Sequence, residues 1–139
     1  NKLLDLLLSK YSALCNNNNI KLNIEVRTAN LDYVPDSDLS MIINNLMDNA
    51  FESAKQSREK VIDFSLIRVN NFDILKVSNS CDTPPIDKAH KLLTTKKSKA
   101  EHGFGTRIIE KYAKKNNAEY EWLYENDKKL FIATIIFKH

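Results

Sequence analysis

Three polar side chains on one predicted helix, Asn45, Asn49 and Glu52, have a spacing that suggests chemistry. They follow one another at i, i+4 and i+7, so a helix stacks them on one face. Asparagine costs about half a kcal/mol relative to alanine inside a helix, and such local inconsistency often marks a functional site. Their oxygens suit a hard cation such as Mg²⁺ together with phosphate oxygens. The alternative is a solvated helix face without chemistry.

The second candidate is the pair Gly103 and Gly105, the only two glycines in the chain. Gly-x-Gly at a helix start lets the backbone approach a phosphate, which the free N–H groups and the helix dipole favour. Threonines and lysines in 94–102 could neutralise a polyphosphate. No Gly-Lys-Ser/Thr follows and no strand leads directly into the motif, which disfavours a Walker A loop and a dinucleotide fold. A glycine-capped turn beside solvated lysines is the alternative.

A third, weaker candidate is Asn79, whose amide could hydrogen-bond the edge of a base, although asparagine after a strand is also a common turn residue. Cys15 and Cys81 form no disulfide framework and, with the isolated histidines, no zinc spacing, so we expect a reducing compartment. No local motif supports a nucleophilic pair of Cys81 and His102. We expect Trp122 to pack rather than to stack on nucleic acid.

Apolar periodicity predicts the elements that must position these candidates. Helices are predicted over 2–15, 36–56, 86–93 and 104–116, and strands over 20–26, 61–69, 72–78, 118–124 and 130–137. The strand at 20–26 should be half-buried, Asp36 or Ser37 should cap the second helix, and 94–103 should be a mobile loop. Asn70-Asn71 and 125–128 should close two hairpins. The fold class is therefore α/β: a two-layer sandwich with a mixed sheet of about five strands on about three helices.

Composition sets the class of protein. The chain has 139 residues, of which 42% are hydrophobic and 28% charged, as expected of one globular domain over 1–139. The net charge of +3 is too balanced to indicate a nucleic-acid partner. No apolar run approaches the ~20 residues of a membrane span, and no signal peptide is visible. Because the chain begins at Asn1, we expect a domain of a longer protein.

The order of the motifs resembles the GHKL (Bergerat) ATP-binding fold, and most closely the catalytic domain of Agr-type sensor histidine kinases, which answer peptide pheromones. Residues 45–52 (NLMDNAFE) resemble its N box, and 77–81 (VSNSC) resemble the Agr-type first glycine box. Thr94-Thr95-Lys96 and the later HGFG at 102–105 resemble the ATP lid and the second glycine box. The resemblance covers nearly the whole chain, with 1–18 as the helix that leads in from a missing dimerisation domain.

The resemblance implies a role for each motif residue. Asn49 would coordinate the Mg²⁺ that bridges the phosphates of ATP, and Asn45 would support the metal or a phosphate; both would be catalytic. Asn79 would stand where an aspartate normally recognises the adenine amino group. The remaining nucleotide-binding residues would be Glu52 and Lys55 at the phosphate or ribose side, Thr95, Lys96 and His102 in the lid, and Gly103, Phe104, Gly105 and Thr106 at the phosphates.

The sequence departs from the family pattern at several positions. Asn79 lacks the usual carboxylate charge, Cys81 replaces a glycine, and Thr106 replaces a leucine. Asn45 stands where the hydrolytic members of the superfamily carry a glutamate general base. An amide cannot take a proton from water near neutral pH, which favours a kinase over an ATPase.

The implied function is a protein-histidine kinase that donates the γ-phosphoryl group of Mg-ATP to a histidine on a separate dimerisation domain of the same protein. The acceptor is absent here, since His90 and His102 fall in or beside the lid. We expect a monomeric fragment, a homodimeric full-length protein anchored in the membrane with this domain on the cytoplasmic side, and a response regulator downstream. The alternative is a GHKL-like binding module that contacts a partner regulator without nucleotide.

Overall fold

The computed structural model of the chain describes residues 1–85 and 104–138. Its elements are α1 (Lys2–Asn17), β1 (Lys21–Arg27), α2 (Asp36–Lys55), β2 (Val61–Val69), β3 (Phe72–Ser80), α3 (Phe104–Lys115), β4 (Glu119–Glu125) and β5 (Leu130–Lys138). Each lies within a few residues of a predicted element. The helix predicted at 86–93 and the mobile loop predicted at 94–103 lie outside the described residues.

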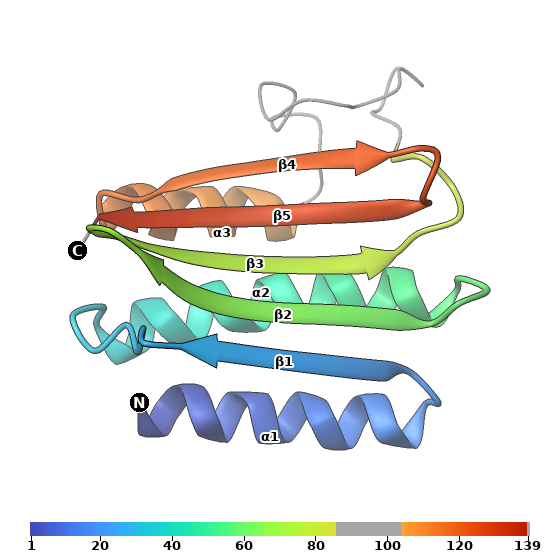
Figure 1. Cartoon of the computed structure of the whole chain (residues 1–139), viewed down its shortest axis with the longest axis horizontal. Coiled ribbons are helices and arrows are strands. Elements are labelled where there is room, and N and C mark those ends of the chain that lie inside the picture. The colour runs from blue at the N-terminus through green and yellow to red at the C-terminus, as the bar shows by residue number, and fades with distance from the viewer. Residues whose placement is uncertain (86–103, 139) are drawn as a thin grey trace.

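The strands form one mixed sheet in the order β1-β2-β3-β5-β4. Strand β1 runs parallel to β2, and the other neighbours are antiparallel. Helices α2 and α3 lie behind the sheet in the view of Figure 1, and α1 lies beside the edge strand β1 and packs against α2. The predicted two-layer α/β sandwich is therefore confirmed. None of the helices within residues 1–85 and 104–138 is long and apolar enough to span a bilayer.

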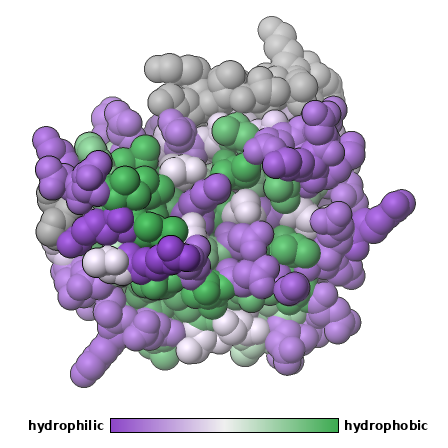
Figure 2. Space-filling view, in the orientation of Figure 1, coloured by the Kyte–Doolittle hydropathy of each residue, from purple (hydrophilic) through white to green (hydrophobic). Residues whose placement is uncertain are grey.

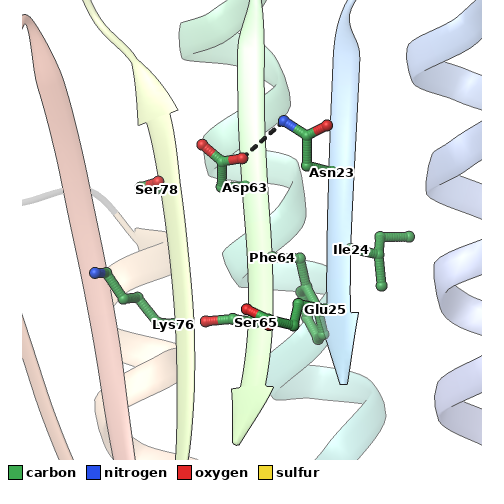
Figure 3. A pocket seen from close by; sticks show the side chains of 8 residues that line it. All are labelled: Asn23, Ile24, Glu25, Asp63, Phe64, Ser65, Lys76 and Ser78. Atoms are coloured by element: carbon green, nitrogen blue, oxygen red, sulfur yellow. Dashed lines mark hydrogen bonds between the residues drawn. The ribbon is translucent and has the colours of Figure 1, made fainter. Parts of the chain in front are cut away.

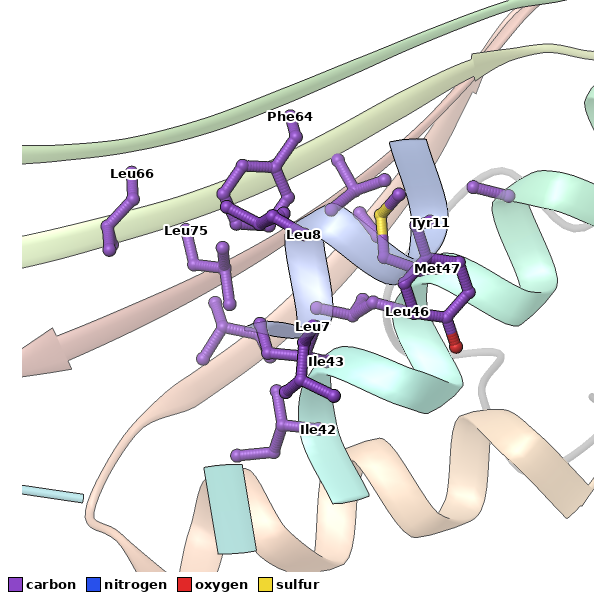
Figure 4. Packing of buried hydrophobic residues seen from close by; sticks show 14 of the residues in the cluster. Leu7, Leu8, Tyr11, Ile42, Ile43, Leu46, Met47, Phe64, Leu66 and Leu75 are labelled. Atoms are coloured by element: carbon purple, nitrogen blue, oxygen red, sulfur yellow. The ribbon is translucent and has the colours of Figure 1, made fainter. Parts of the chain in front are cut away.

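The core lies between the helices and the sheet, and α2 is its central helix (Figure 4). Helical periodicity points Ile42, Ile43 and Met47 inward, and all three are fully buried. Because side chains alternate between the two faces along a strand, Phe64 of β2 and Leu75 of β3 both point into this core. Burying one such side chain stabilises the fold by roughly 1.5–3 kcal/mol, so this layer fixes where the polar side of α2 must face.

The two predicted hairpins are confirmed. Val69 pairs with Phe72 across the two-residue turn, where Asn70 takes the left-handed conformation with φ 56°. Asparagine tolerates that region better than most residues, which explains its use in this turn. The second hairpin buries Trp122, whose ring stacks on Phe131 with 5.4 Å between the centroids. The prediction that Trp122 packs is therefore correct.

Two local predictions are wrong. Pro35 occupies the N-cap position of α2 and no side chain caps the helix, so neither Asp36 nor Ser37 is the cap. The Pro35 carbonyl accepts from the Leu39 N–H at 2.9 Å, and the carboxylate of Asp36 lies in the first turn, where the helix dipole favours it. Strand β1 is mostly exposed rather than half-buried, because it is an edge strand with only α1 packed against it.

The sheet face away from the helices is open to solvent. Figure 2 shows hydrophilic side chains there around separate hydrophobic groups. The most exposed apolar side chains on this face are Val69 and Phe72 at the β2–β3 hairpin and Leu123 on β4, each 42–47% exposed. Separate apolar groups of this kind are ordinary on a protein surface.

Candidate functional site

The asparagines of α2 do three different things. Asn44 faces α1, where its Oδ1 accepts from Lys10 Nζ at 3.1 Å. The side chain of Asn45 is half-buried, and its Nδ2 donates to the Met41 carbonyl at 2.7 Å. The Asn49 side chain is exposed and hydrogen-bonds to no described residue. Asn44 therefore makes a contact between helices, whereas Asn45 and Asn49 belong to the predicted stripe.

The predicted stripe itself is present on α2. Because the donor of Asn45 is used within its own helix, its Oδ1 is left as an acceptor. Asn49 and Glu52 follow it on the exposed side. Lys55 is exposed at the end of α2, and its Nζ lies 5.7 Å from the centroid of the Phe51 ring. The helix thus presents a row of oxygen atoms with one ammonium group at its C-terminal end.

Asn79 lies within a strand, and the prediction of a loop there is wrong. Strand β3 continues to Ser80, and Asn79 pairs with Ile62 on one side and Phe131 on the other. Ile62 is fully buried in the helix-facing core, so Asn79, directly opposite it, also points toward the helices. Asn79 is 2% exposed, and its Nδ2 donates to the Ser80 carbonyl at 3.0 Å. Its amide oxygen is then the atom left to accept from a ligand.

Two serines that sequence reasoning missed fix the end of β3 against the end of α2. The Oγ atoms of Ser57 and Ser80 lie 2.6 Å apart, and both residues are buried. Ser57 also donates to the Ala54 carbonyl, and Ser80 accepts from the Val61 N–H at 3.0 Å. Buried hydroxyls need such partners, and here they rigidify the strand end next to Asn79. Ser57 follows the end of α2 and Ser80 is the last residue of β3, and neither position carries a sequence signal for this contact.

Helices α2 and α3 are antiparallel and packed together. Asp38 in the first turn of α2 accepts from Lys115 Nζ in the last turn of α3 at 3.0 Å. Eleven residues separate Asp38 from Asn49, and eleven separate Lys115 from Phe104. At about 1.5 Å per residue both distances are about 17 Å, so the first turn of α3 lies about level with Asn49. Figure 1 shows α2 and β3 ending at the right of the view, and α3 starting near the middle and running to the left.

This arrangement has the chemistry of an anion site. The helical part of the predicted second glycine box, Phe104 to Thr106, forms the first turn of α3, whose backbone N–H groups have no partner within the helix. The other predicted residues of that box and of the lid, Thr95, Lys96, His102 and Gly103, lie outside the described residues. Among the described residues no group of three or more His, Cys, Asp or Glu side chains could hold a metal ion. A cation here would depend on amide oxygens and on the phosphates themselves, and the oxygens of Asn45 and Asn49 fit that role.

The loop after β3 is held by its backbone. The Cys81 N–H donates to the Lys129 carbonyl at 2.8 Å, and the Cys81 carbonyl accepts from the Tyr124 hydroxyl at 2.7 Å. The Cys81 thiol donates to the Thr83 carbonyl at 3.1 Å. The residue that replaces a family glycine is therefore accommodated by contacts to the β4–β5 hairpin.

A separate depression of about 380 Å³ lies on the open face of the sheet (Figure 3). Its polar lining includes Asn23, Asp63 and Ser78, which are register partners on β1, β2 and β3. Asn23 Nδ2 donates to Asp63 Oδ1 at 2.8 Å. The depression contains none of the predicted site residues and lies on the other side of the sheet from Asn79.

Comparisons with known proteins agree with this geometry. A family profile described as the GHKL domain matches residues 36–138, and a search of curated proteins finds no match. The catalytic domain of the histidine kinase ThkA, in a nucleotide-free form, superposes with a TM-score of 0.73 at 17% identity, covering 99% of this chain and 92% of that one.

Two longer kinases give similar superpositions. For the histidine kinase AdeS of Acinetobacter baumannii the TM-score is 0.69 at 15% identity, covering 99% of this chain and 63% of that one. For the blue-light activated histidine kinase of Erythrobacter litoralis EL346 the TM-score is 0.73 at 17% identity, covering 98% and 60%. At 15–17% identity these superpositions show that the fold is shared and no more. The family profile, by contrast, matches most of the chain and shows family membership. The chain belongs to the GHKL family and has the fold of histidine kinase catalytic domains.

Proposed function

We propose that the chain is the catalytic domain of a sensor histidine kinase, which binds Mg-ATP and donates the γ-phosphoryl group to a histidine on a separate dimerisation domain. The observation that supports the proposal is the contact of Asp38 with Lys115, which brings Asn49 about level with the first turn of α3, while Asn79 points from β3 toward the helices. Membership of the GHKL family supports it.

Asn79 is proposed to recognise adenine. Its Nδ2 is engaged by the Ser80 carbonyl, which leaves Oδ1 to accept from the exocyclic amino group. The hydroxyl pair of Ser57 and Ser80 holds this strand end in place. A positioned acceptor of this kind favours adenine over guanine, which carries a carbonyl at the corresponding atom.

The phosphates are proposed to lie between α2 and the start of α3. Asn49 would coordinate Mg²⁺, which when bound neutralises charge on the phosphates, and Asn45 would support the metal or a phosphate. Glu52 and Lys55 would lie at the phosphate or ribose side. Thr95, Lys96 and His102 would belong to the ATP lid. The glycine-box residues would line the phosphates at the N-terminus of α3: Gly103, Phe104, Gly105 and Thr106.

Transfer needs no general base from this domain. A histidine nitrogen supplied by the dimerisation domain forms the bond to the γ-phosphorus as the bond to the β–γ bridging oxygen breaks, leaving ADP. This chain would contribute position and electrostatic stabilisation through Asn45, Asn49 and the N–H groups of α3. The amide of Asn45 cannot activate water, which supports transfer over hydrolysis.

The rest of the proposal concerns the whole protein. We place residues 1–139 in one catalytic domain, with 1–18 leading in from the dimerisation domain. The fragment would be monomeric, and the full-length kinase would be a homodimer with a response regulator as its downstream partner. The sequence motifs support an Agr-type kinase that answers a peptide pheromone, anchored in the membrane with this domain on the cytoplasmic side.

Calorimetric titration with a non-hydrolysable ATP analogue tests the proposal. Binding should depend on Mg²⁺, and Asn49→Ala should weaken it by about tenfold or more, because a ligand to the metal is lost. Asn71→Ala is the matched control, since Asn71 is an exposed turn residue at the opposite end of β3. Absence of both heat and thermal stabilisation at millimolar nucleotide would overturn the proposal and favour the nucleotide-free binding module.

A further inference from the structure

We propose that Tyr11 is a positioning residue for the nucleotide site: its hydroxyl sets the rotation of α2 about its own axis by holding Asn44 and Asp48, the two residues that directly precede Asn45 and Asn49. The inference rests on the proposed function, because it concerns the same site. Tyr11 belongs to α1, contacts no predicted site residue, and reads in the sequence as an ordinary core aromatic.

The hydroxyl of Tyr11 lies at a junction of two helices. The residue is fully buried, and in Figure 4 its ring lies beside Met47 and Leu46 with the oxygen pointing away from the sheet. The hydroxyl donates to Asp48 Oδ1 at 2.7 Å, and it also lies 3.0 Å from Asn44 Oδ1 and 3.2 Å from the Asn44 carbonyl. One proton thus faces three acceptors, and the carboxylate is the strongest of them.

Lys10 completes the junction. Its Nζ donates to Asn44 Oδ1 at 3.1 Å and lies 4.8 Å from the centroid of the Tyr11 ring. The Tyr11 hydroxyl has a single proton, which it donates to Asp48. The Lys10 ammonium group is therefore the donor to Asn44 Oδ1. Asn44 is held from the other side as well, because its Nδ2 donates to Ser40 Oγ at 3.2 Å. Burial, and next the hydrogen bond to Asp48, raise the pKa of Tyr11, so the hydroxyl remains a donor at physiological pH.

These contacts between α1 and α2 determine the direction in which the side chains of Asn45 and Asn49 point. Asn44 and Asp48 are one helical turn apart, and each lies about 100° around the helix from its neighbour in the stripe. Because a helix is stiff, fixing this face fixes the angle at which Asn45 and Asn49 leave α2. A rotation of about 10° moves an atom ~6 Å from the helix axis by about 1 Å. A displacement of that size is enough to damage a preorganised site.

The competing explanation is that Tyr11 only stabilises the fold, and the chain contains a matched residue that separates the two. Tyr33 also donates its hydroxyl to a carboxylate, Asp73 Oδ2, at 2.6 Å, although Asp73 is buried and Asp48 is exposed. Asp73 lies at the start of β3, six residues from Asn79, which is about 20 Å along a strand. Tyr33 therefore shares the chemistry of Tyr11 but not its connection to α2.

The experiment compares Tyr11→Phe with Tyr33→Phe. Each variant keeps its ring and loses a hydroxyl, and both should lose stability in urea, followed by the fluorescence of the single tryptophan, Trp122. Affinity for the Mg²⁺-bound ATP analogue is measured well below the unfolding transition. We expect about tenfold weaker binding for Tyr11→Phe, the usual effect of one hydrogen bond to a charged group, and unchanged binding for Tyr33→Phe.

A second pair of variants tests the path through Asp48. Asp48→Ala should weaken binding by a similar factor, and adding it to Tyr11→Phe should cause little further loss, because both remove the same hydrogen bond. Equal effects of Tyr11→Phe and Tyr33→Phe, or binding by Tyr11→Phe within about twofold of wild type, would overturn the inference while the proposed function stands. Failure of the wild-type chain to bind nucleotide would overturn both.

Discussion

Asp38 and Lys115 join the first turn of α2 to the last turn of α3 through a 3.0 Å hydrogen bond between Oδ1 and Nζ. The second oxygen of Asp38 accepts from Asn116 Nδ2 at 3.2 Å. Asp38 is 1% exposed, whereas the Lys115 side chain is 60% exposed. Each charge also suits its helix end, an acid at an N-terminus and a base at a C-terminus. This contact sets the register that brings the start of α3 level with Asn49.

Removing this contact should loosen α3. In Asp38→Ala we expect the backbone amides of α3 to exchange with deuterium about tenfold faster, because a hydrogen bond to a charged group is lost. Asp36→Ala is the control, since Asp36 lies in the same turn but is exposed. Mass spectrometry of exchanged peptides from 104–115 provides the measurement. Equal protection in the two variants would contradict a role for Asp38 in holding α3.

Acid should destabilise the chain partly through Asp38. The hydrogen bond from Lys115 holds the pKa of Asp38 below its usual range, with a smaller contribution from Asn116 and an opposing one from burial. The unfolded chain protonates this group near pH 3.9, and the folded chain only at lower pH. Between those values the unfolded state binds more protons, so stability falls as the pH drops below about 4.

Lys115→Met makes that prediction measurable, because it removes the largest cause of the lowered pKa. The urea midpoint, followed by Trp122 fluorescence, should fall less steeply with pH in this variant between about pH 5 and pH 3. The wild-type chain carries the same other carboxylates, so their contribution cancels in the comparison. Identical slopes would show that Lys115 does not perturb Asp38.

The sequence was sufficient to predict the elements whose pattern repeats. The apolar arc of α2 continues over 20 residues, which is enough to predict that Asn45 and Asn49 form a polar stripe beside it. Both hairpins were recognisable because their strands alternate and their turns contain residues that tolerate a left-handed backbone. Such patterns depend only on residues close together in the sequence, so they predict a helix or strand whatever tertiary fold buries its apolar face.

Contacts between distant segments could not be predicted. The Tyr11 hydroxyl donates a hydrogen bond to Asp48, 37 residues later in the chain, and no local sequence pattern at either residue predicts this contact. Asn44 and Asn45 are neighbouring amides of one type, and only the position of α1 separates their roles. In β1, Ile24 and Val26 alternate as in a half-buried strand but remain 43% exposed, because only the tertiary arrangement decides what covers an edge.

Asn79→Asp should lower stability even though it restores the residue that the family resemblance leads one to expect. An ionised carboxylate cannot donate to the Ser80 carbonyl, and at 2% exposure it has little access to water. The expected loss in the free energy of unfolding is about 1–3 kcal/mol by urea titration. Ser78→Ala, on the neighbouring strand position with no such bond to Ser80, provides the comparison. Unchanged stability would mean that the amide donor of Asn79 contributes nothing to the fold.

Asp73 should matter for stability and not for the nucleotide site. It is fully buried on β3 and accepts from Arg68 Nε at 2.8 Å, from Arg68 Nη2 at 3.1 Å and from the Tyr33 hydroxyl. Asp73→Ala removes the buried carboxylate that accepts from Arg68 and Tyr33, which should lower the free energy of unfolding by about 1–3 kcal/mol. The exposed Asp63 on β2 is the control, and Asp63→Ala should change stability by less than about 0.5 kcal/mol.

Nucleotide affinity separates this effect from one on the site. Asp73 lies about 20 Å along β3 from Asn79, so Asp73→Ala should bind the ATP analogue as the wild type does at a temperature where both are folded. Calorimetry well below the unfolding midpoint provides that comparison. Weaker binding by the folded variant would mean that strand β3 transmits changes along its length, and the site would then depend on both ends of the sheet.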